Sequence, residues 1–482
     1  METAAADAEV VVIGAGPAAT LFLAAMGACR PTAGRRRLAV VAPDEVDGPG
    51  VPYRTADPRH RMNVPAGQLS VRADAPDDFV TWAQREGAPV TAGSFVPRRL
   101  YGEYLAWAWC TWASAFDVGR FREAATALRP VVGGVEVRTA RGAVLRARHA
   151  VLAVGPGAGT PPFEVADEVR ADGGFVADPW APAGLAGLEG ARRVVLVGTG
   201  LTAVDAALTL SAARGVEEIV AVSPSGALPC AHADGPTAAA LAVPPPPEPL
   251  TARTLLRWVH GACRDEPNGW RAVLDALRFD LGPLWSRLAP AERGRLARLV
   301  GSRWTRHRHR MAPAVHAEVE ALVAAGRLRV QRGRVRRIRS AGEAVRVELA
   351  GGRSDGACPP LLEAEAVVDC SGLPPLSRLA DPLVRRLLDD GVLVPDPLGL
   401  GVLTDAQGRA VGGTGTPSHV VSVLGALRRG TELEATAVPD LRRQAVALAR
   451  RLTGHPASPC CPPCASPSCA AMDGRSPGGR DR

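Results

Sequence analysis

Lysine is absent from this 482-residue chain, and all 57 of its basic residues are arginines. The absence excludes Schiff-base chemistry and general-base catalysis by a lysine amine. The arginines are scattered among 49 acidic residues, and the sequence carries none of the recognised nucleic-acid-binding modules. The formal net charge of +8 therefore does not predict a nucleic-acid partner, and anionic cofactors would account for part of it.

Long apolar stretches are also missing. No segment approaches the roughly 20 continuous apolar residues that cross a bilayer, and acidic residues at Glu2, Asp7 and Glu9 replace the basic start of a secretory signal. Ten cysteines in a chain without such a signal are typical of reduced thiols. We therefore expect a cytoplasmic protein with no membrane or nucleic-acid partner. The sequence carries no signature of an oligomeric state.

Short apolar runs, bounded by glycines or polar residues, recur along the chain. They lie at 10–13, 38–42, 151–154, 194–197, 219–222 and 367–368. Continuous apolarity of this kind is typical of strands buried on both faces of a parallel sheet. Helical patterns lie between several runs, as at Ala18–Cys29 and Leu201–Ala213. The alternation predicts an α/β protein.

The first apolar run leads into a glycine turn and a helix. Gly14, Gly16 and Ala19 form a GxGxxA pattern, and Pro17 opens the helix. The first glycine permits a tight turn, the second lets the backbone approach a diphosphate, and the alanine lets the helix lie close to the strand. Free N–H groups and the helix dipole then favour negative charge at this point. The pattern predicts a dinucleotide site rather than a purely structural turn.

The second strand departs from that pattern where it ends. An acidic residue usually stands there to bind the adenosine ribose, but this strand ends in Ala42-Pro43-Asp44. We expect Asp44 to reach the ribose from two residues further along.

The same unit recurs 184 positions later, with Gly198, Gly200 and Ala203 in the GxGxxA positions. Two such units predict two Rossmann-like domains, one for FAD and one for a nicotinamide. The strand that follows ends in Ser223-Pro224-Ser225. It offers neither the arginine typical of NADP sites nor the acid typical of NAD sites, so NADPH and NADH both remain open. Arg214 or the cluster Arg306–Arg310 could compensate in space.

Further motifs occur in the order in which a known family carries them. They are Gly50–Tyr53, His60–Ala66, Asp78–Trp82, Phe95–Arg99, Tyr104–Trp107, Gly425–Thr431 and Ala437–Arg442. On these motifs the chain resembles a bacterial family of FAD/NAD(P)-binding proteins with two dinucleotide domains. It is similar to the flavin-dependent N-hydroxylating monooxygenases of amines and amino acids. The likeness extends over roughly residues 8 to 452 and is specific to family, not to substrate.

The resemblance implies that Asn63, Val64 and Pro65 line the reactive face of the flavin. Asn63 is then the candidate catalytic residue, through a polar contact to the ring. The alternative is a packed loop in which proline and asparagine serve as turn formers. His60, Arg61 and Arg98 are secondary candidates.

The resemblance also places the closing motif, with Gly425 and Thr431, beside the flavin. A helix beginning after Gly430 would direct its positive N-terminus at the pyrimidine end of the ring, where it would stabilise the anionic reduced flavin.

Two glycines mark turns at which the chain is expected to cross between domains. Gly155 follows the run at 151–154, and Gly372 follows Asp369-Cys370-Ser371. Both would permit close backbone approach to a cofactor. Cys370 has no partner at CxxC spacing, so packing is favoured over disulfide chemistry.

The densest basic cluster lies at 306–310. Arg308 and Arg310 could clamp a cofactor phosphate or an acidic substrate, and the alternative is a solvated helix end. Four tail cysteines, at Cys460, Cys461, Cys464 and Cys469, are enough in number for zinc. They stand in a Pro/Ser-rich tail without a second spaced pair, so we predict a disordered extension and no metal.

These inferences combine into one domain plan. The FAD-binding domain is discontinuous, at 1–184 and 351–454. An NAD(P)-binding domain with a helical segment at 252–300 is inserted at 185–350, and 455–482 forms a disordered tail. We predict an FAD-dependent oxidoreductase that accepts hydride from NAD(P)H, and a monooxygenase that oxygenates a small nitrogen-containing substrate through a hydroperoxyflavin. The alternatives are an NAD(P)H:acceptor oxidoreductase without oxygen insertion and a non-catalytic FAD/NAD(P)-binding sensor.

Overall fold

A computed structural model describes most of the chain in two units. The described residues are 7–29, 35–181, 184–233, 246, 248–266, 269–277, 281–350, 361–432 and 434–455. The larger unit takes Met1–His232 and Ser302–His455, and a smaller unit lies within Ala233–Gly301. The predicted disordered tail, with its four cysteines, lies outside the described residues apart from His455.

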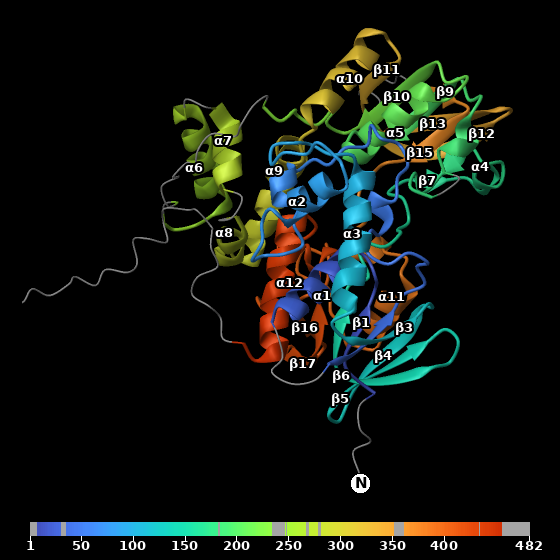
Figure 1. Cartoon of the computed structure of the whole chain (residues 1–482). Helices are drawn as coiled ribbons and strands as arrows, with labels where there is room; N and C mark the ends of the chain where they lie inside the picture. The colour runs from blue at the N-terminus through green and yellow to red at the C-terminus, as the bar shows by residue number, and fades with distance from the viewer. Residues whose placement is uncertain are drawn as a thin grey trace, which may run out of the picture. The chain divides into compact units, whose positions relative to one another are not determined.

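The first sheet of the larger unit is built around the strand that precedes the first glycine turn. Strand β1 pairs in parallel with β2 on one side and with β6 on the other. The sheet runs in the order β16-β17-β6-β1-β2-β3, and the antiparallel pair β4–β5 adds to β6 (Figure 1). Its strands are β1 (Ala8–Ile13), β2 (Arg37–Val41), β3 (Asp117–Phe121), β4 (Ala125–Val131), β5 (Gly134–Thr139), β6 (Val144–Leu152), β16 (Arg409–Val411) and β17 (Pro417–Val423).

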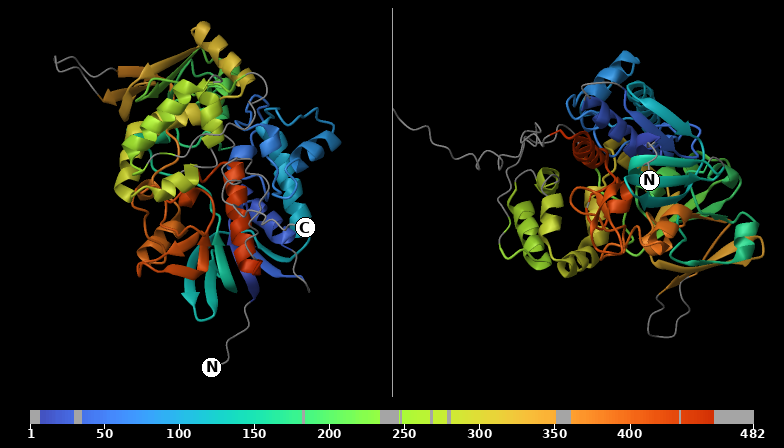
Figure 2. Two further views of the ribbon diagram at one scale, coloured as in Figure 1. Left: turned by 90° about the vertical axis from the view of Figure 1, so that its left-hand side faces the viewer. Right: turned by 90° about the horizontal axis from the view of Figure 1, so that it is seen from below.

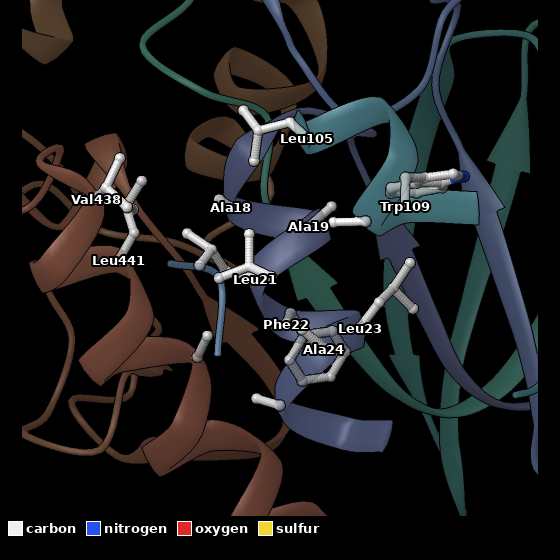
Figure 3. Packing of buried hydrophobic residues seen from close by; sticks show 14 of the residues in the cluster. Ala18, Ala19, Leu21, Phe22, Leu23, Ala24, Leu105, Trp109, Val438 and Leu441 are labelled. Atoms are coloured by element: carbon white, nitrogen blue, oxygen red, sulfur yellow. The ribbon is translucent and has the colours of Figure 1, made fainter. Parts of the chain in front are cut away.

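Helix α1 (Pro17–Ala28) lies between α3 (Arg98–Ala113) and α12 (Val438–Thr453) (Figures 1 and 2). Its alanines permit this close packing, and Figure 3 shows leucine and valine side chains from α3 and α12 beside it. Leu21 and Phe22 are fully buried here, and each such side chain contributes about 1.5–3 kcal/mol through burial. The glycine turn in front of α1 is therefore held on a rigid layer. Helices α2 (Asp78–Arg85) and α11 (Pro382–Asp389) complete this part, which we call the first lobe.

The second lobe repeats the parallel plan. Its five-stranded sheet runs in the order β11-β10-β9-β15-β8, with every pair parallel. One face packs with α5 and α10, and the other face packs on a four-stranded sheet, β14-β13-β12-β7. The elements are β7 (Glu164–Val165), α4 (Asp167–Ala171), β8 (Phe175–Val176), β9 (Arg193–Val197), α5 (Leu201–Ala212), β10 (Glu218–Ser223), α10 (Pro313–Ala324), β11 (Leu328–Arg332), β12 (Arg334–Ala341), β13 (Ala344–Ala350), β14 (Leu361–Ala364) and β15 (Ala366–Asp369).

The predicted fold class is confirmed, with strands at all six apolar runs. Sheet membership moves the proposed bounds of the inserted domain outward, from 185–350 to about 164–369, because β7, β8, β14 and β15 belong to the sheets of the second lobe. Several of these strands are too short or too exposed to produce an apolar run in the sequence. The chain leaves the first sheet after β6 and the sheets of the second lobe after β15. That Gly155 and Gly372 are the crossing points stays a prediction.

The helical segment forms the smaller unit instead of a part of the second lobe. Its helices are α6 (Ala252–Asp265), α7 (Gly269–Leu277), α8 (Leu281–Arg287) and the start of α9 (Pro290–Arg308). The side chain of Thr251 caps α6 by accepting a hydrogen bond from the backbone N–H of Thr254, at 3.1 Å. Among the described residues, no helix combines the length and the apolar character that crossing a bilayer requires.

Candidate functional site

The two glycine turns have the same backbone hydrogen bonds. Gly14 N–H donates to the carbonyl of Val41 at 2.9 Å, and Gly198 N–H donates to the carbonyl of Val222 at 2.8 Å. In each lobe the turn is thus tied to the end of the neighbouring strand. The sequence repeat is therefore also a repeat in three dimensions.

The first glycine of each turn cannot be replaced without a clash. Gly14 has φ of +110° and Gly198 has φ of +126°, both in the region that favours glycine. A Cβ on Gly14 would lie 2.3 Å from the carbonyl oxygen of Ala153, and one on Gly198 would lie 2.1 Å from that of Cys370. Burial raises the pKa of the Cys370 thiol, so this cysteine packs and does not supply a reactive thiolate.

The second glycine of each turn faces open space in front of a helix. A Cβ on Gly200 would meet no described atom within 4 Å, and one on Gly16 would meet the Cα of Gly50 at 3.8 Å. Both residues are N-caps, of α5 and α1, and the first N–H groups of a helix have no acceptor within it. Ala19 and Ala203 are buried where each helix meets its strand. These features fit a dinucleotide diphosphate at each turn.

The family motif Gly50–Tyr53 forms one wall of the first turn. Gly48 N–H donates to the carbonyl of Ala15 at 2.8 Å. A Cβ on Gly50, which has φ of +60°, would lie 2.8 Å from the Cδ of Pro17. The motif therefore needs glycine because it is pressed against the start of α1.

The loop after β2 is held by arginines. Arg54 donates to the carboxylate of Asp44 at 2.9 Å, and Arg122 donates to the Asp44 carbonyl at 2.7 Å. Arg120 forms a 2.7 Å ion pair with Asp47. The predicted ribose contact of Asp44 therefore remains a prediction, with Arg54 as a competitor for its carboxylate.

The turn that contains Asn63, Val64 and Pro65 is fixed by the segment before α3. Met62 N–H donates to the carbonyl of Val96 at 2.8 Å. Val64 is buried, whereas Asn63 and Pro65 are half-buried. Within the described residues, no hydrogen bond to the side-chain amide of Asn63 is formed, so this amide is available to a ligand.

His232 was not anticipated from the sequence. Its Nε2 lies 3.0 Å from the carbonyl oxygen of Asn63 and its ring centroid lies 4.7 Å from that of Phe95. The backbone of this segment bonds to Met311, whose N–H donates to the carbonyl of Cys230 at 2.8 Å. A lone histidine before a proline-rich stretch carried no signal, because its partner is 169 positions away.

The closing motif meets the start of α1. Gly425, with φ of +85°, donates its N–H to the side-chain oxygen of Gln444 at 2.9 Å. A Cβ on this glycine would lie 3.6 Å from the Cβ of Ala18. The side-chain oxygen of Thr431 accepts a hydrogen bond from the N–H of Thr404 at 3.4 Å.

The helix expected after Gly430 is α12, which begins at Val438. A 3-10 turn, Ala426–Arg428, comes first. Pro439 sets this start because proline is tolerated in the first turn of a helix but not in its interior.

Arg308 and Arg310 are buried, at 6% and 2% exposure. They therefore do not form the solvated helix end that was the alternative to a clamp. Arg308 faces Glu434 at 3.5 Å, so its charge is already partly balanced. A phosphate or substrate clamp at these two arginines stays a prediction.

A polar cluster joins the two lobes, and we call it the interlobe cluster (Asp57, His60, Arg98, Asp205 and Thr209). Arg98 of α3 forms a 2.8 Å ion pair with Asp205 of α5, both largely buried. His60 Nε2 lies 2.9 Å from both the Asp205 carbonyl and the Thr209 hydroxyl, which donates to Asp57 at 3.0 Å. Burial raises the pKa of Asp205, against the opposing charges of Arg98 and His60. Two of the secondary sequence candidates thus hold the lobes together.

Residues 11–157 contain the first glycine turn, the Gly50–Tyr53 motif and the Asn63 turn, and they match a family described as FAD-NAD(P)-binding. This part of the chain is therefore similar to FAD-NAD(P)-binding domains. The comparison with curated proteins found no match to this chain.

Solved structures of similar fold extend the comparison beyond residues 11–157. Ornithine N-hydroxylase from Kutzneria sp. 744 has a TM-score of 0.62 and 17% identity, over 92% of this chain and 98% of the other. The cadaverine monooxygenase DfoA of Erwinia amylovora has a TM-score of 0.57 and 13% identity, over 95% and 99%. Bacillithiol disulfide reductase from Bacillus cereus has a TM-score of 0.53 and 12% identity, over 93% and 99%. The chain therefore has the fold of the two-dinucleotide-domain flavoproteins.

Proposed function

We propose that this protein is an FAD-dependent oxidoreductase that takes hydride from NADPH or NADH. The observation that carries the proposal is the pair of glycine turns with matching backbone geometry in lobes joined by a buried ion pair. One turn would hold FAD and the other the nicotinamide dinucleotide. Bound FAD would supply the redox chemistry, accepting hydride and passing electrons to oxygen or another acceptor.

The residues of this chain would bind and orient. Gly14 and Gly16 would receive the FAD diphosphate at the start of α1. The Asn63 amide would donate to the flavin ring, and His232 would fix its loop through the Asn63 carbonyl. The interlobe cluster would keep the nicotinamide turn at a set position relative to the flavin.

Oxygenation of a small nitrogen-containing substrate is the finer proposal. Ornithine N-hydroxylase and cadaverine monooxygenase share this fold over nearly their whole length, which supports an amine or amino acid as substrate. Such chemistry depends on shielding and positioning more than on an acid–base pair. A lysine cannot contribute to substrate binding here, because the chain has none.

A second candidate is an NAD(P)H:acceptor oxidoreductase without oxygen insertion. The fold of bacillithiol disulfide reductase favours it. Burial raises the pKa of the Cys370 thiol, so this cysteine would not supply the thiolate for a thiol mechanism.

Reduction of the purified, FAD-loaded protein under anaerobic conditions tests the proposal. We expect NADPH or NADH to bleach the flavin absorbance, and oxygen with an amine substrate to restore it with formation of an N-hydroxylated product. If oxygen restores the flavin absorbance but hydrogen peroxide is the only product across a panel of small amines, the second candidate is favoured. A flavin that neither coenzyme bleaches would refute both and leave a non-catalytic sensor.

Paired variants separate the two turns. Gly16→Glu places a carboxylate where the FAD diphosphate would lie, and we expect complete loss of flavin. Gly200→Glu should retain flavin but lose its reduction by coenzyme. Gly301→Glu, on an exposed helix face with no atom near its Cβ position, is the control. Full flavin content in the Gly16 variant would contradict the assignment.

A further inference from the structure

Arg332 lies at the carboxyl end of the parallel sheet of the second lobe, beside the end of β10, although the two are far apart in the sequence. This inference rests on the proposed function, because it concerns the nicotinamide dinucleotide. In NADP sites an arginine near the end of the second strand meets the 2′-phosphate, and in NAD sites an acid meets the ribose. Residues 223–227 after β10 contain neither. The neighbouring strand β11 ends at Arg332, which is the register partner of Ser223.

Arg332 points to the side of the sheet on which α5 lies. Side chains two residues apart share one face of a strand. Leu328 of the same strand is buried in the cluster that includes α5, and Arg332 stands four positions further along. The side chain of Arg332 therefore emerges at the carboxyl end of the sheet, on the face of the helix that starts at the glycine turn.

The loop after β10 is wrapped closely around this arginine. Gly226, with φ of +60°, has its Cβ position 2.7 Å from the Cβ of Arg332. Gly333 N–H donates to the carbonyl of Ser223 at 2.9 Å. The end of β11 is thereby fixed against the loop that would surround the adenosine ribose.

A row of hydroxyl groups connects the glycine turn to this loop. Thr199, inside the turn, donates to the hydroxyl of Ser223 at 2.9 Å. The Ser223 and Ser225 hydroxyls lie 3.1 Å apart. Hydroxyl groups donate well to phosphate oxygens. Thr199 and Ser223 are buried, and the exposed Ser225 is the hydroxyl of this row that is open to a phosphate beside Arg332.

Charge at this end of the sheet favours an anion. Arg332 is exposed, and among the described residues it forms neither an ion pair nor a hydrogen bond. Residues 223–227, which lie beside Arg332, include no carboxylate that would repel a phosphate. The planar guanidinium suits two-pronged contact with phosphate oxygens.

We propose that Arg332, together with the hydroxyl of Ser225, binds the 2′-phosphate of NADPH and makes this protein selective for NADPH over NADH. Arg332 at the end of β11 would thus take the place of the arginine that NADP sites usually carry after their second strand, which here is β10. The specificity-determining residue lies 109 positions from the strand end that it serves.

Binding of two nucleotides without nicotinamide tests this proposal apart from catalysis. Calorimetric titration of the flavin-loaded protein should give tighter binding of 2′,5′-ADP than of 5′-AMP. In Arg332→Ala, affinity for 2′,5′-ADP should fall on the order of 10- to 100-fold, the range for a charge-assisted hydrogen bond. Affinity for 5′-AMP should change by less than about twofold. Thermal midpoint and flavin content of the variant should match the parent protein.

Arg329→Ala is the matched control. Arg329 belongs to the same strand but forms a 3.4 Å ion pair with Glu218, and its removal should leave both affinities unchanged. Conversely, Ser225→Asp should reverse the preference toward 5′-AMP. Equal affinities of the parent protein for both nucleotides would overturn the Arg332 assignment alone. Binding of neither nucleotide would overturn it together with the dinucleotide site, and so with the proposed function.

Discussion

Single buried residues show how the first lobe controls charge near its sheet. His149 of β6 is buried, and its Nε2 lies 3.0 Å from the hydroxyl of Ser422 on β17. Burial, and then the nearby charge of Arg451, lowers the pKa of His149 to about 4. The imidazole is therefore neutral in the folded protein at pH values where an exposed histidine is protonated.

The lowered pKa of His149 predicts that the protein becomes less stable toward unfolding in acid. Because the folded pKa lies below the unfolded value of about 6.5, the stability contribution is complete above pH 6.5 and is lost as pH falls toward 4. Between pH 7 and pH 5 the free energy of unfolding should decrease by about 2 kcal/mol from this group. His149→Gln should remove that part of the pH dependence when urea unfolding is compared at the two pH values. An unchanged pH dependence in the variant would contradict the assignment.

At the scale of elements, helices α3 and α5 carry the contact between the lobes. The ion pair of Arg98 and Asp205 is largely buried, at 13% and 5% side-chain exposure. Trp180 lies beside it, 5.5 Å from the guanidinium of Arg98 and 5.8 Å from the ring of His60. Removing one partner of such a pair leaves the other charge buried without compensation.

Asp205→Ala should therefore cost about 3 kcal/mol in the free energy of unfolding. Flavin should be retained, while reduction by coenzyme becomes slower because the lobes lose their fixed orientation. Glu217→Ala is the control, since Glu217 and Arg192 form an exposed pair at 2.8 Å, and its loss should cost less than about 1 kcal/mol. Denaturant unfolding and stopped-flow flavin reduction measure the two effects. Equal losses in the two variants would show that the interlobe pair does not hold the lobes.

For the larger unit as a whole, the interlobe cluster implies one cooperative structure with two ligand sites. A ligand that binds the folded state stabilises everything that unfolds with it. FAD and NADP⁺ should therefore raise the midpoint of the same calorimetric transition, each by the equivalent of about 2.7 kcal/mol at 100 times its dissociation constant. Separate transitions, each responding to one ligand, would show that the lobes unfold independently. We expect separate transitions of the two lobes in the Asp205→Ala variant.

The local part of this architecture could be predicted from the sequence. Gly14 and Gly198 are recognisable because strand, turn and helix follow one another within about a dozen residues, and each step has its own residue preferences. The buried parallel strands carry continuous apolar runs for the same reason. The domain bounds are harder to predict from the sequence, because β7 and β8 have two residues each and leave no periodic pattern.

The sequence by itself determined two dinucleotide turns on an α/β scaffold and the exclusion of lysine chemistry. Only the tertiary structure decided which distant residues meet: Arg98 with Asp205, His232 with the Asn63 loop, and Arg332 with the end of β10. Periodicity and turn preferences act between near neighbours along the chain. The register between strands is set when apolar faces pack together, so the neighbours of a strand end are fixed only by the folded sheet.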